Sequence, residues 1–143
     1  MGEITIRAAS PDDAPVLSRL SNQLGYDRPV EETRDRIARS SNLEALFVAE
    51  VDGEIVGWIH GYDVELVQYP RFMEIGGLVV ADQSRGTGIG RRLVEAVVEW
   101  GRDRGHSEVR VRSNVIRDGA HAFYEGIGFT REKTSHTFAL PLH

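Results

Sequence analysis

The most informative stretch of the sequence is Leu78-Val79-Val80-Ala81-Asp82-Gln83-Ser84-Arg85-Gly86-Thr87-Gly88-Ile89-Gly90. An apolar, strand-like run leads into a loop with glycine at alternate positions, and a helical pattern begins directly after it. Glycine lets the backbone approach a ligand closely, and the first turn of a helix presents unpaired N–H groups with a partial positive charge. Since Arg85, Arg91 and Arg92 add positive charge, the stretch predicts an anion site, most commonly one for phosphate.

Two common phosphate loops do not match this stretch. The P-loop requires a lysine directly after its last glycine, and no lysine follows these glycines. The dinucleotide fingerprint G-x-G-x-x-G also fails, because its third glycine position after Gly86 and Gly88 holds Arg91. An enzyme that uses NAD or ATP is therefore disfavoured. A glycine-rich turn that only links a strand to a helix is the remaining alternative, and the adjacent arginines speak against it.

The patterns on either side of the loop predict the element order β-α-α-β-β-β-α-β-α-β-β. Asp52-Gly53 indicates a hairpin, and Gly76-Gly77 inside an apolar run indicates a β-bulge or a close backbone approach. Hairpins beside one strand-helix-strand crossover predict an α/β fold with a mixed sheet flanked by helices. The expected strands cover residues 4–7, 45–51, 54–59 with a less certain continuation to 66, 73–80 and 109–112, and they include the end of the chain at Phe129 and from Phe138 to Leu142. The expected helices cover residues 10–25, 29–37, 89–105 and 118–127.

Composition narrows the classes of function. The length of 143 residues fits a single domain over 1–143, and the net charge of -5 argues against a nucleic-acid partner. The absence of cysteine excludes disulfides and thiolate chemistry, and it suits a reducing cytoplasm. No apolar run approaches the ~20 residues that cross a bilayer, and the start of the chain carries no signal-peptide pattern. We expect neither a membrane partner nor a metal.

A second motif lies near the C-terminus. It reads A-x-x-F-Y-x-x-x-G-F and is formed by Ala120, Phe123, Tyr124, Gly128 and Phe129. The glycine loop fits the pattern [QR]-x-x-G-x-[GA] through Gln83, Gly86 and Gly88. With both motifs in the expected elements, the chain resembles the GNAT superfamily of N-acetyltransferases over its whole length.

The resemblance implies a GNAT-like fold in which the strand before the loop splays away from the next strand, with acetyl-CoA in the cleft. It implies that free backbone groups of Leu78, Val79 and Val80 pair with the pantetheine arm. The backbone amides that would hold the pyrophosphate belong to Arg85, Gly86, Thr87, Gly88, Ile89 and Gly90. Many members carry asparagine seven residues before the tyrosine. Here that position is Arg117, and Asn114 is the substitute candidate for a cofactor contact.

The resemblance also implies catalytic roles. Tyr124 would donate a proton to the departing sulfur of CoA, whereas the alternative is that Tyr124 is only a core aromatic. Glu74 is the first candidate for the base that deprotonates the amine, and an ordinary strand-surface acid is the equal alternative. If no bulge intervened, Glu74 would share the sheet face of Leu78. A backbone N–H at Val79 or nearby would polarise the acyl carbonyl. Contributions through water are open to His60, Tyr62 and Glu65, although a lone histidine in a strand is more often simply hydrogen bonded.

The acceptor pocket is expected at two segments of the chain. By resemblance, the segments Leu20 to Ile37 and Gly61 to Arg71 shape its pocket, and Gln23-Leu24-Gly25-Tyr26 looks similar to acetyltransferases of the aminoglycoside type. Two roles are open to the acidic residues of this region: they attract a cationic amine, or they are solvated surface residues. These residues are Asp27, Glu31, Glu32, Asp63 and Glu65. We expect direct transfer to a small-molecule amine. The alternatives are a peptide acceptor or a catalytically silent acyl-CoA-binding module. Phe138 and Leu140 favour a homodimer through the terminal strands.

Overall fold

A computed structural model of the chain describes residues 2–113 and 118–142. The chain divides into two compact units, Met1–Val111 and Arg112–His143, and each unit is described by itself. That residues 1–143 act as one domain stays a prediction.

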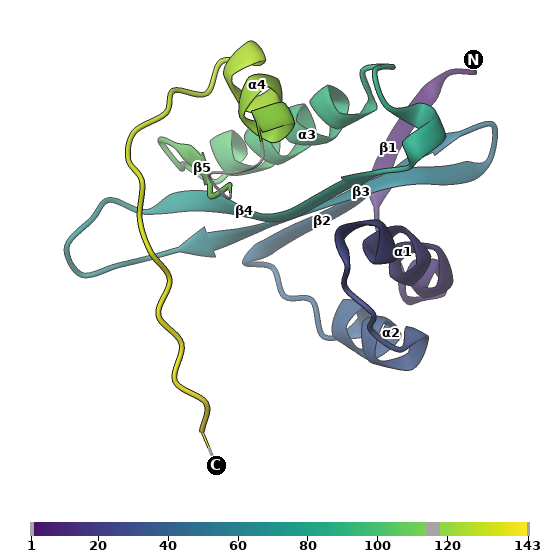
Figure 1. Cartoon of the computed structure of the whole chain (residues 1–143), viewed down its shortest axis with the longest axis horizontal. Helices are drawn as coiled ribbons and strands as arrows, with labels where there is room; N and C mark the ends of the chain where they lie inside the picture. The colour runs from purple at the N-terminus through teal and green to yellow at the C-terminus, as the bar shows by residue number, and fades with distance from the viewer. Residues whose placement is uncertain (1, 114–117, 143) are drawn as a thin grey trace. The chain divides into compact units, whose positions relative to one another are not determined.

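The first unit is a mixed sheet with helices on both of its faces (Figure 1). The sheet has five strands in the order β1-β2-β3-β4-β5; neighbours are antiparallel except β4 and β5, which are parallel. The α/β class and the mixed sheet predicted from the sequence are therefore confirmed. The elements are β1 (Ile4–Ala8), α1 (Ala14–Ser21), α2 (Val30–Ala38), β2 (Glu44–Val51), β3 (Glu54–Val64), β4 (Phe72–Val80), α3 (Ile89–Asp103) and β5 (Val109–Val111), with short 3-10 turns at Pro11–Asp13, Asn22–Leu24 and Asp82–Ser84.

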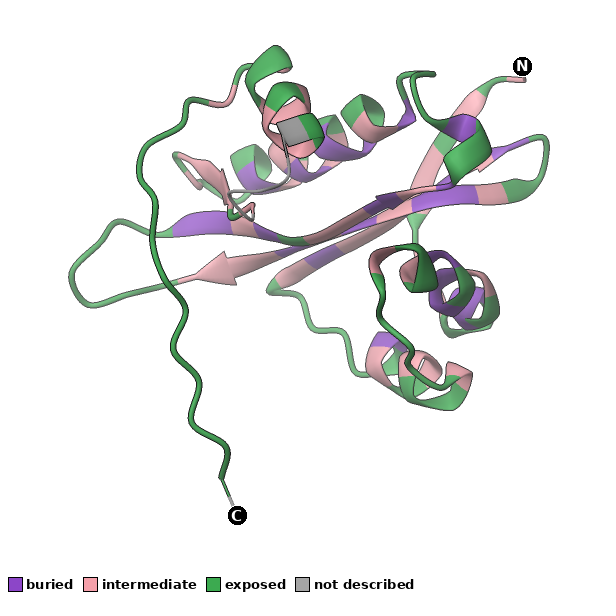
Figure 2. Ribbon diagram, in the orientation of Figure 1, coloured by how far each residue is buried: buried purple, intermediate pink, exposed green. Residues whose placement is uncertain are grey.

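Apolar side chains fill both sides of this sheet. Helix α3 lies on one face and buries its apolar stripe there, whereas α1 and α2 lie on the other face (Figure 2). Fully buried side chains of this size each contribute roughly 1.5–3 kcal/mol through their removal from water. The residues below 2% exposure include Ile59, Met73, Ile89, Leu93 and Val97, and the cluster beneath α1 and α2 is built on Ala14, Leu17, Ile37 and Val48. The sheet is thus packed on both of its faces by apolar side chains.

The hairpin predicted at Asp52-Gly53 is present. Asp52 and Gly53 have φ of 53° and 81° and join β2 to β3, which is the pair of positive φ values that a tight two-residue hairpin turn requires. Strand β3 extends to Val64, so the less certain continuation of this strand beyond Ile59 is confirmed in part.

The second unit contains α4 (Asp118–Gly126), and here one prediction is wrong. The strands expected at Phe129 and from Phe138 to Leu142 do not form in the described part of the chain. Alternation of apolar residues marks a ribbon with two faces, but a strand also needs a hydrogen-bonding neighbour. No ladder pairs this segment among the described residues, and the exposures of Phe138, Leu140 and Leu142 are 93%, 82% and 91%.

A part-buried ion pair joins β1 to the turn that precedes α1. Two nitrogens of Arg7 donate to the carboxylate of Asp13 at 2.8 and 2.9 Å, and the N–H of Ser10 donates to the same carboxylate at 2.7 Å. Asp13 is 7% exposed. The hydrogen bond from Arg7, with help from Ser10, lowers the pKa of Asp13 below its ordinary value of 3.8 despite burial.

We expect Asp13→Asn to reduce the free energy of unfolding by about 1–3 kcal/mol at neutral pH, because the variant leaves the Arg7 guanidinium and the N–H of Ser10 without a charged acceptor. The folded-state pKa of Asp13 is depressed, so its contribution is complete above the unfolded value and is lost as the pH falls through the folded value. The deficit of the variant should therefore shrink below about pH 4. Urea unfolding at several pH values measures it, with the exposed neighbour Asp12→Asn as the matched control. A deficit that does not change with pH would contradict the assignment.

Candidate functional site

Strand β4 contains the bulge that the sequence predicted. In the ladder with β3, Gly77 pairs with His60 and Ile75 pairs with Gly61, so Gly76 is the extra residue. Aromatic rings of β3 cover these glycines: a Cβ on Gly76 would lie 3.0 Å from Cε1 of Tyr62, and a Cβ on Gly77 would lie 2.8 Å from Cη2 of Trp58. Glycine at both positions is therefore required by the close approach of the two rings.

The bulge decides which face of the sheet Glu74 occupies. Glu74 pairs with Tyr62 on one side of the bulge, and Leu78 pairs with Ile59 on the other side. Cross-strand partners share a face and successive residues alternate. Glu74 therefore lies on the face of Tyr62 and His60, whereas Leu78 lies on the opposite face. The shared face of Glu74 and Leu78, expected only without a bulge, is not present.

Beyond the bulge, the outer edge of β4 has no paired strand among the described residues. Strand β5 pairs only with Met73, Glu74 and Ile75, so no described residue continues that ladder along the rest of β4. On the inner side, the N–H of Ala81 donates to the carbonyl of Val56 at 2.7 Å. Since an antiparallel ladder alternates, Val79 directs its N–H and C=O toward β3. The backbone groups that reach the outer edge are those of Leu78 and Val80.

The backbone of the glycine loop has a conformation suited to binding an anion. Gly86 and Gly88 have φ of 77° and 87°, a left-handed conformation that glycine adopts without steric cost. Gly88 is the N-cap of α3, so the first N–H groups of the helix lack partners within it. A Cβ on Gly86 or Gly88 would meet nothing within 4 Å. The loop therefore leaves space for a ligand against its backbone, and it fits the pyrophosphate of a nucleotide cofactor.

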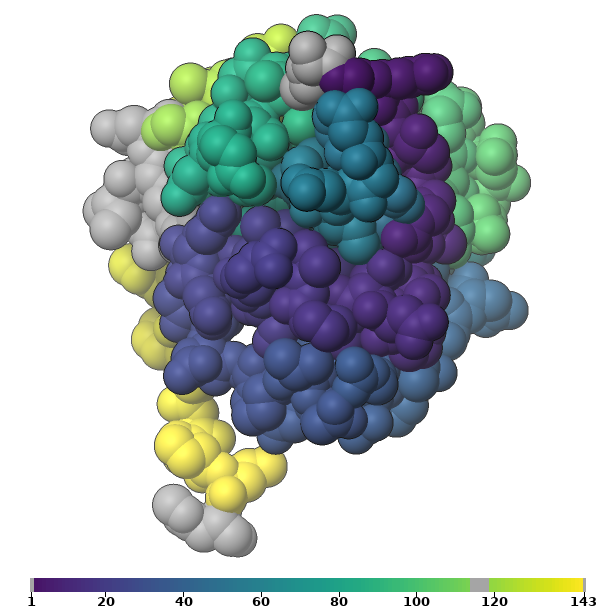
Figure 3. All heavy atoms as spheres, turned by 90° about the vertical axis from the view of Figure 1, so that its right-hand side faces the viewer, coloured from purple at the N-terminus to yellow at the C-terminus, as the bar shows by residue number. Residues whose placement is uncertain are grey.

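Gln23 fastens the connection between α1 and α2 to the end of β4, and the sequence did not single out this role. Its Nε2 donates to the carbonyl of Val80 at 3.0 Å, and its Oε1 accepts from the N–H of Asp82 at 3.2 Å. Figure 3 shows residues of the first two helices and of the segment after β4 on one face of the molecule. The Val80 carbonyl, which lies on the outer edge, is thus already engaged by a side chain.

Two pairs of titratable groups lie on the face of the bulge that carries Glu74. Tyr62 donates a hydrogen bond from its hydroxyl to Oε2 of Glu74. Nε2 of His60 lies 2.8 Å from Oε1 of Glu44, and the rings of His60 and Tyr62 are 5.8 Å apart. The sequence singled out Glu74, Tyr62 and His60, whereas Glu44 was missed because only the register of β2 and β3 brings it to His60. Glu65, in contrast, is exposed in the connection after β3.

The carboxylate of Glu44 is strongly stabilised in its charged form. Burial opposes ionisation, but hydrogen bonds from the N–H of Ser41, from Arg36 and from His60 outweigh it and lower the pKa of Glu44 to about 2. The distances are 3.0 Å from the Ser41 nitrogen to Oε2 and 2.7 Å from Nη2 of Arg36 to Oε1. Glu44 is therefore an anion throughout the neutral range.

Asp63 is not available to attract a cationic amine, and the sequence expectation for it is wrong. Its side chain is 8% exposed and accepts hydrogen bonds from Arg71 at 2.5 Å and from His106. Burial opposes ionisation, but these two partners lower the pKa of Asp63. Asp63 lies one residue before the end of β3 and Arg71 directly precedes β4, so the cluster joins both ends of the connection between these strands.

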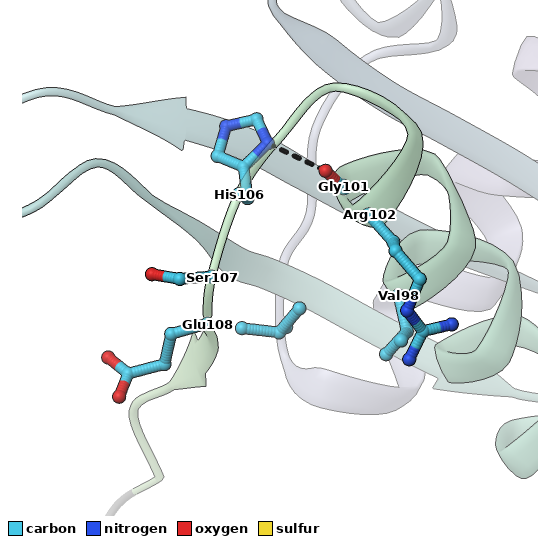
Figure 4. Close-up of a pocket in the computed structure, with 7 residues that line it drawn as sticks. Val98, Gly101, Arg102, His106, Ser107 and Glu108 are labelled. Carbon is cyan, nitrogen blue, oxygen red and sulfur yellow. Dashed lines mark hydrogen bonds between the residues drawn. The ribbon is translucent and has the colours of Figure 1, made fainter.

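His106 also borders a shallow pocket between the end of α3 and β5. Its ring nitrogen Nδ1 lies 3.1 Å from the carbonyl of Gly101, as Figure 4 shows. The pocket is lined by residues from Val98 to Val109. None of them belongs to the predicted site, so the pocket is not part of the predicted acetyl-transfer site.

Tyr124 lies on α4 in the second unit, packed among aromatic side chains. Its ring contacts those of Phe123 and Phe129, with centroids 5.2 and 5.5 Å away and steep interplanar angles. Burial raises the pKa of Tyr124 above its ordinary value of 10.0, so the phenol keeps its proton at neutral pH. Asn114 and Arg117 lie outside the described residues.

In the part of the chain that the structure describes, no group of three or more histidine, aspartate or glutamate side chains is placed to hold a metal ion. No helix in residues 2–113 or 118–142 has the length and apolar character needed to cross a bilayer.

A strand edge without a paired neighbour beside a glycine loop at a helix N-terminus is what the predicted class of acyl-CoA-dependent transferases requires, and comparison with known proteins identifies the family. The pattern of the Acetyltransferase (GNAT) family matches residues 14–129. The chain belongs to this family, whose members take acetyl groups from acetyl-CoA, so the cofactor predicted from the sequence is confirmed.

Relatives of known name include acetyltransferases of two kinds. An aminoglycoside N(6')-acetyltransferase type 1 from Stenotrophomonas maltophilia is 36% identical, and the alignment covers 96% of this chain and 94% of that protein. A probable N-acetyltransferase family 8 member 5 from Mus musculus is 38% identical over 61% of this chain. The match spans only 39% of the mouse protein.

Solved structures share the fold at lower identity. An aminoglycoside N-acetyltransferase, AAC(6')-Iy, determined in complex with CoA, superposes with a TM-score of 0.87 at 18% identity, covering 99% of this chain and 97% of that chain. A ribosomal-protein-alanine N-acetyltransferase from Brucella melitensis biovar Abortus 2308 superposes with a TM-score of 0.79 at 20% identity, covering 97% of this chain and 100% of that chain. The fold alone therefore does not separate small-molecule from peptide acceptors.

Proposed function

We propose that the protein transfers the acetyl group of acetyl-CoA directly to a primary amine of a small molecule, in a ternary complex of enzyme, donor and acceptor. The observation that carries the proposal is the bulge at Gly76, where β4 parts from β5 and where Glu74 lies on the same sheet face as Tyr62 and His60. The near full-length similarity to an aminoglycoside acetyltransferase supports a small-molecule acceptor.

The donor is bound by backbone groups. Along the outer edge of β4, Leu78 offers its N–H and C=O groups and Val80 offers its N–H group to the pantetheine arm, as an added strand would. The carbonyl of Val80 is already held by Gln23, and Val79 lies between the two residues with its own groups directed toward β3. The pyrophosphate is held by the amides of the loop and the first helical turn, at Arg85, Gly86, Thr87, Gly88, Ile89 and Gly90. Asn114 remains a candidate for one further contact. Bound acetyl-CoA supplies an activated thioester.

Glu74 and Tyr124 have opposite tasks in this proposal. The acceptor arrives mostly as an ammonium ion, and Glu74 takes a proton from it, directly or through water, so that the nitrogen lone pair becomes available. The nitrogen then forms a bond to the acetyl carbon and the carbon–sulfur bond breaks, leaving the electron pair on sulfur. Tyr124, whose pKa is raised by burial, keeps its proton at neutral pH and donates it to that sulfur. The acylated nitrogen releases its second proton to solvent, and solvent returns a proton to the Tyr124 oxygen.

The acceptor class is tested by release of free thiol from acetyl-CoA across aminoglycosides, polyamines, amino acids and peptides. Turnover on one class of small amines is the expected result. Turnover only on peptides would replace the small-molecule assignment by the peptide alternative. CoA binding without turnover on any amine would favour a catalytically silent binding module. Thermal stabilisation by NAD or ATP but not by CoA would contradict the assignment of acetyl-CoA as the donor.

A cytoplasmic location is part of the same proposal and rests on the absence of cysteine.

We also propose that the protein is a homodimer. Phe138, Leu140 and Leu142 alternate along the end of the chain and are all highly exposed, and an alternating apolar ribbon without a neighbour is suited to pairing with another chain. Light scattering at micromolar concentration should give twice the chain mass of 15.9 kDa. The variant Leu140→Asp should reduce that mass to one chain. A single-chain mass for the unmodified protein would remove the proposal.

A further inference from the structure

The contacts of His60 fix which of its ring nitrogens carries a hydrogen. Nε2 lies 2.8 Å from Oε1 of Glu44, and that carboxylate is anchored by the N–H of Ser41 and by Arg36. An ionised carboxylate can only accept hydrogen bonds. Nε2 of His60 must therefore be protonated, and in the neutral ring the lone pair is on Nδ1.

The Nδ1 atom lies over the bulge. A Cβ on Gly76 would lie 3.8 Å from Nδ1 of His60, and Gly76 itself is exposed. Among the described residues no hydrogen bond is made by Nδ1. The basic lone pair of His60 therefore faces the exposed backbone at the point where β4 leaves β5, on the same face as Glu74.

We propose that His60, oriented by Glu44, is a second proton acceptor for the amine, beside Glu74. This inference rests on the acetyl-transfer function proposed above. An ammonium that becomes an amide gives up two protons: one before its lone pair attacks the acetyl carbon and one from the nitrogen of the adduct. One proton replaces the acetyl group on sulfur, and the other must leave for solvent. Glu74 already accepts a hydrogen bond from Tyr62 on Oε2, so a separate acceptor removes the need for one carboxylate to serve both steps.

The charges around His60 suit this role. The groups that face it are Arg36 on α2, Glu44 on β2, Tyr62 on β3 and Glu74 on β4. When Nδ1 takes a proton from the nitrogen of the amine, the N–H bond breaks with its electrons left on that nitrogen, and the imidazolium forms next to the Glu44 carboxylate. Arg36 shares the same carboxylate and offsets part of this attraction. Glu44 is a positioning residue in this arrangement because it acts only through His60.

The decisive variant is His60→Gln. A glutamine amide can still donate to Glu44 from a position close to Nε2, but it has no basic nitrogen. We expect kcat/KM for the amine to fall by about 10²-fold, at the low end of the range for general base catalysis. The affinity for CoA and the melting temperature should stay at wild-type values. The pH profile of kcat/KM should lose one titration, and added imidazole should partly restore the activity of His60→Ala but not of His60→Gln.

Glu44→Gln supplies the second measurement. It keeps an acceptor for Nε2 but removes the charge, so we expect a fall of about tenfold and a displaced pH profile rather than a lost titration. Glu99→Gln, an exposed change of the same type on α3, is the matched control and should behave as wild type. Equal kcat/KM and pH profiles for wild type and His60→Gln would overturn this inference while leaving the acetyl-transfer proposal intact. Absence of turnover in the wild type on every amine would overturn both.

Discussion

Tyr124→Phe is expected to lower kcat by something like 10²–10⁴-fold, because the variant removes the proton that the leaving sulfur requires. Phenylalanine retains the ring that packs between Phe123 and Phe129, so the change is confined to the hydroxyl. The KM values for donor and acceptor should change little, since the lost interaction belongs to the transition state. Initial rates of free-thiol release at saturating donor and amine measure the effect.

Two controls make this prediction specific. CoA affinity and melting temperature should be the same in wild type and Tyr124→Phe, which separates a chemical effect from a structural one. Because burial raises the pKa of Tyr124, the wild type should show no loss of rate from phenol ionisation in the neutral range. A variant with wild-type kcat would remove Tyr124 as the acid and would leave the donor site and the fold unaffected.

Gly88→Ala is expected to raise the dissociation constant for CoA by about 10- to 100-fold, or roughly 1.4–2.8 kcal/mol of binding free energy. At φ of 87°, any residue with a Cβ carries strain. The added methyl group would also occupy the space that the loop leaves open at the start of α3. Relief of that strain would turn the first N–H groups of the helix away from the pyrophosphate. Titration calorimetry with CoA measures the change.

The chain provides a matched control for this strain. Gly105 has φ of 84°, and a Cβ there also meets nothing within 4 Å, but it lies just beyond the opposite end of α3. Gly105→Ala should therefore cost a similar amount of stability in urea unfolding without changing the affinity for CoA. If the two variants weakened CoA binding equally, the effect would be one of global stability and the loop would not be the pyrophosphate site.

Features set by local backbone chemistry could be predicted from the sequence. Paired glycines gave the bulge at Gly76, and Asp52-Gly53 gave the hairpin, since each needs a conformation or an approach that few other residues permit. The alternate glycines before an amphipathic run gave the loop at the start of α3 for the same reason. These features also lie within short stretches, so no knowledge of distant contacts was needed to find them.

Features set by strand register could not be predicted. Glu44 and His60 are 16 residues apart, and nothing in either segment indicates that their side chains meet. Asp63 resembled a surface acid because its partners His106 and Arg71 come from other segments. The predicted strands at the end of the chain failed for a related reason: the apolar alternation was present, but a strand is defined by its neighbour, and the sequence pattern does not name one.

The extra residue in β4 has a consequence for how such a protein can change over time. It reverses the alternation of side chains along the strand. Glu74, before Gly76, and Leu78, after it, therefore lie on opposite faces of the sheet. In the reaction proposed above, substitutions in the first half alter the surface that meets the amine, whereas the second half offers the donor only its backbone. On that proposal, the amine surface can diversify toward new molecules without any change in the groups that bind the donor. Deletion of Gly76 would restore one continuous alternation, so that the two halves of the strand could no longer change independently.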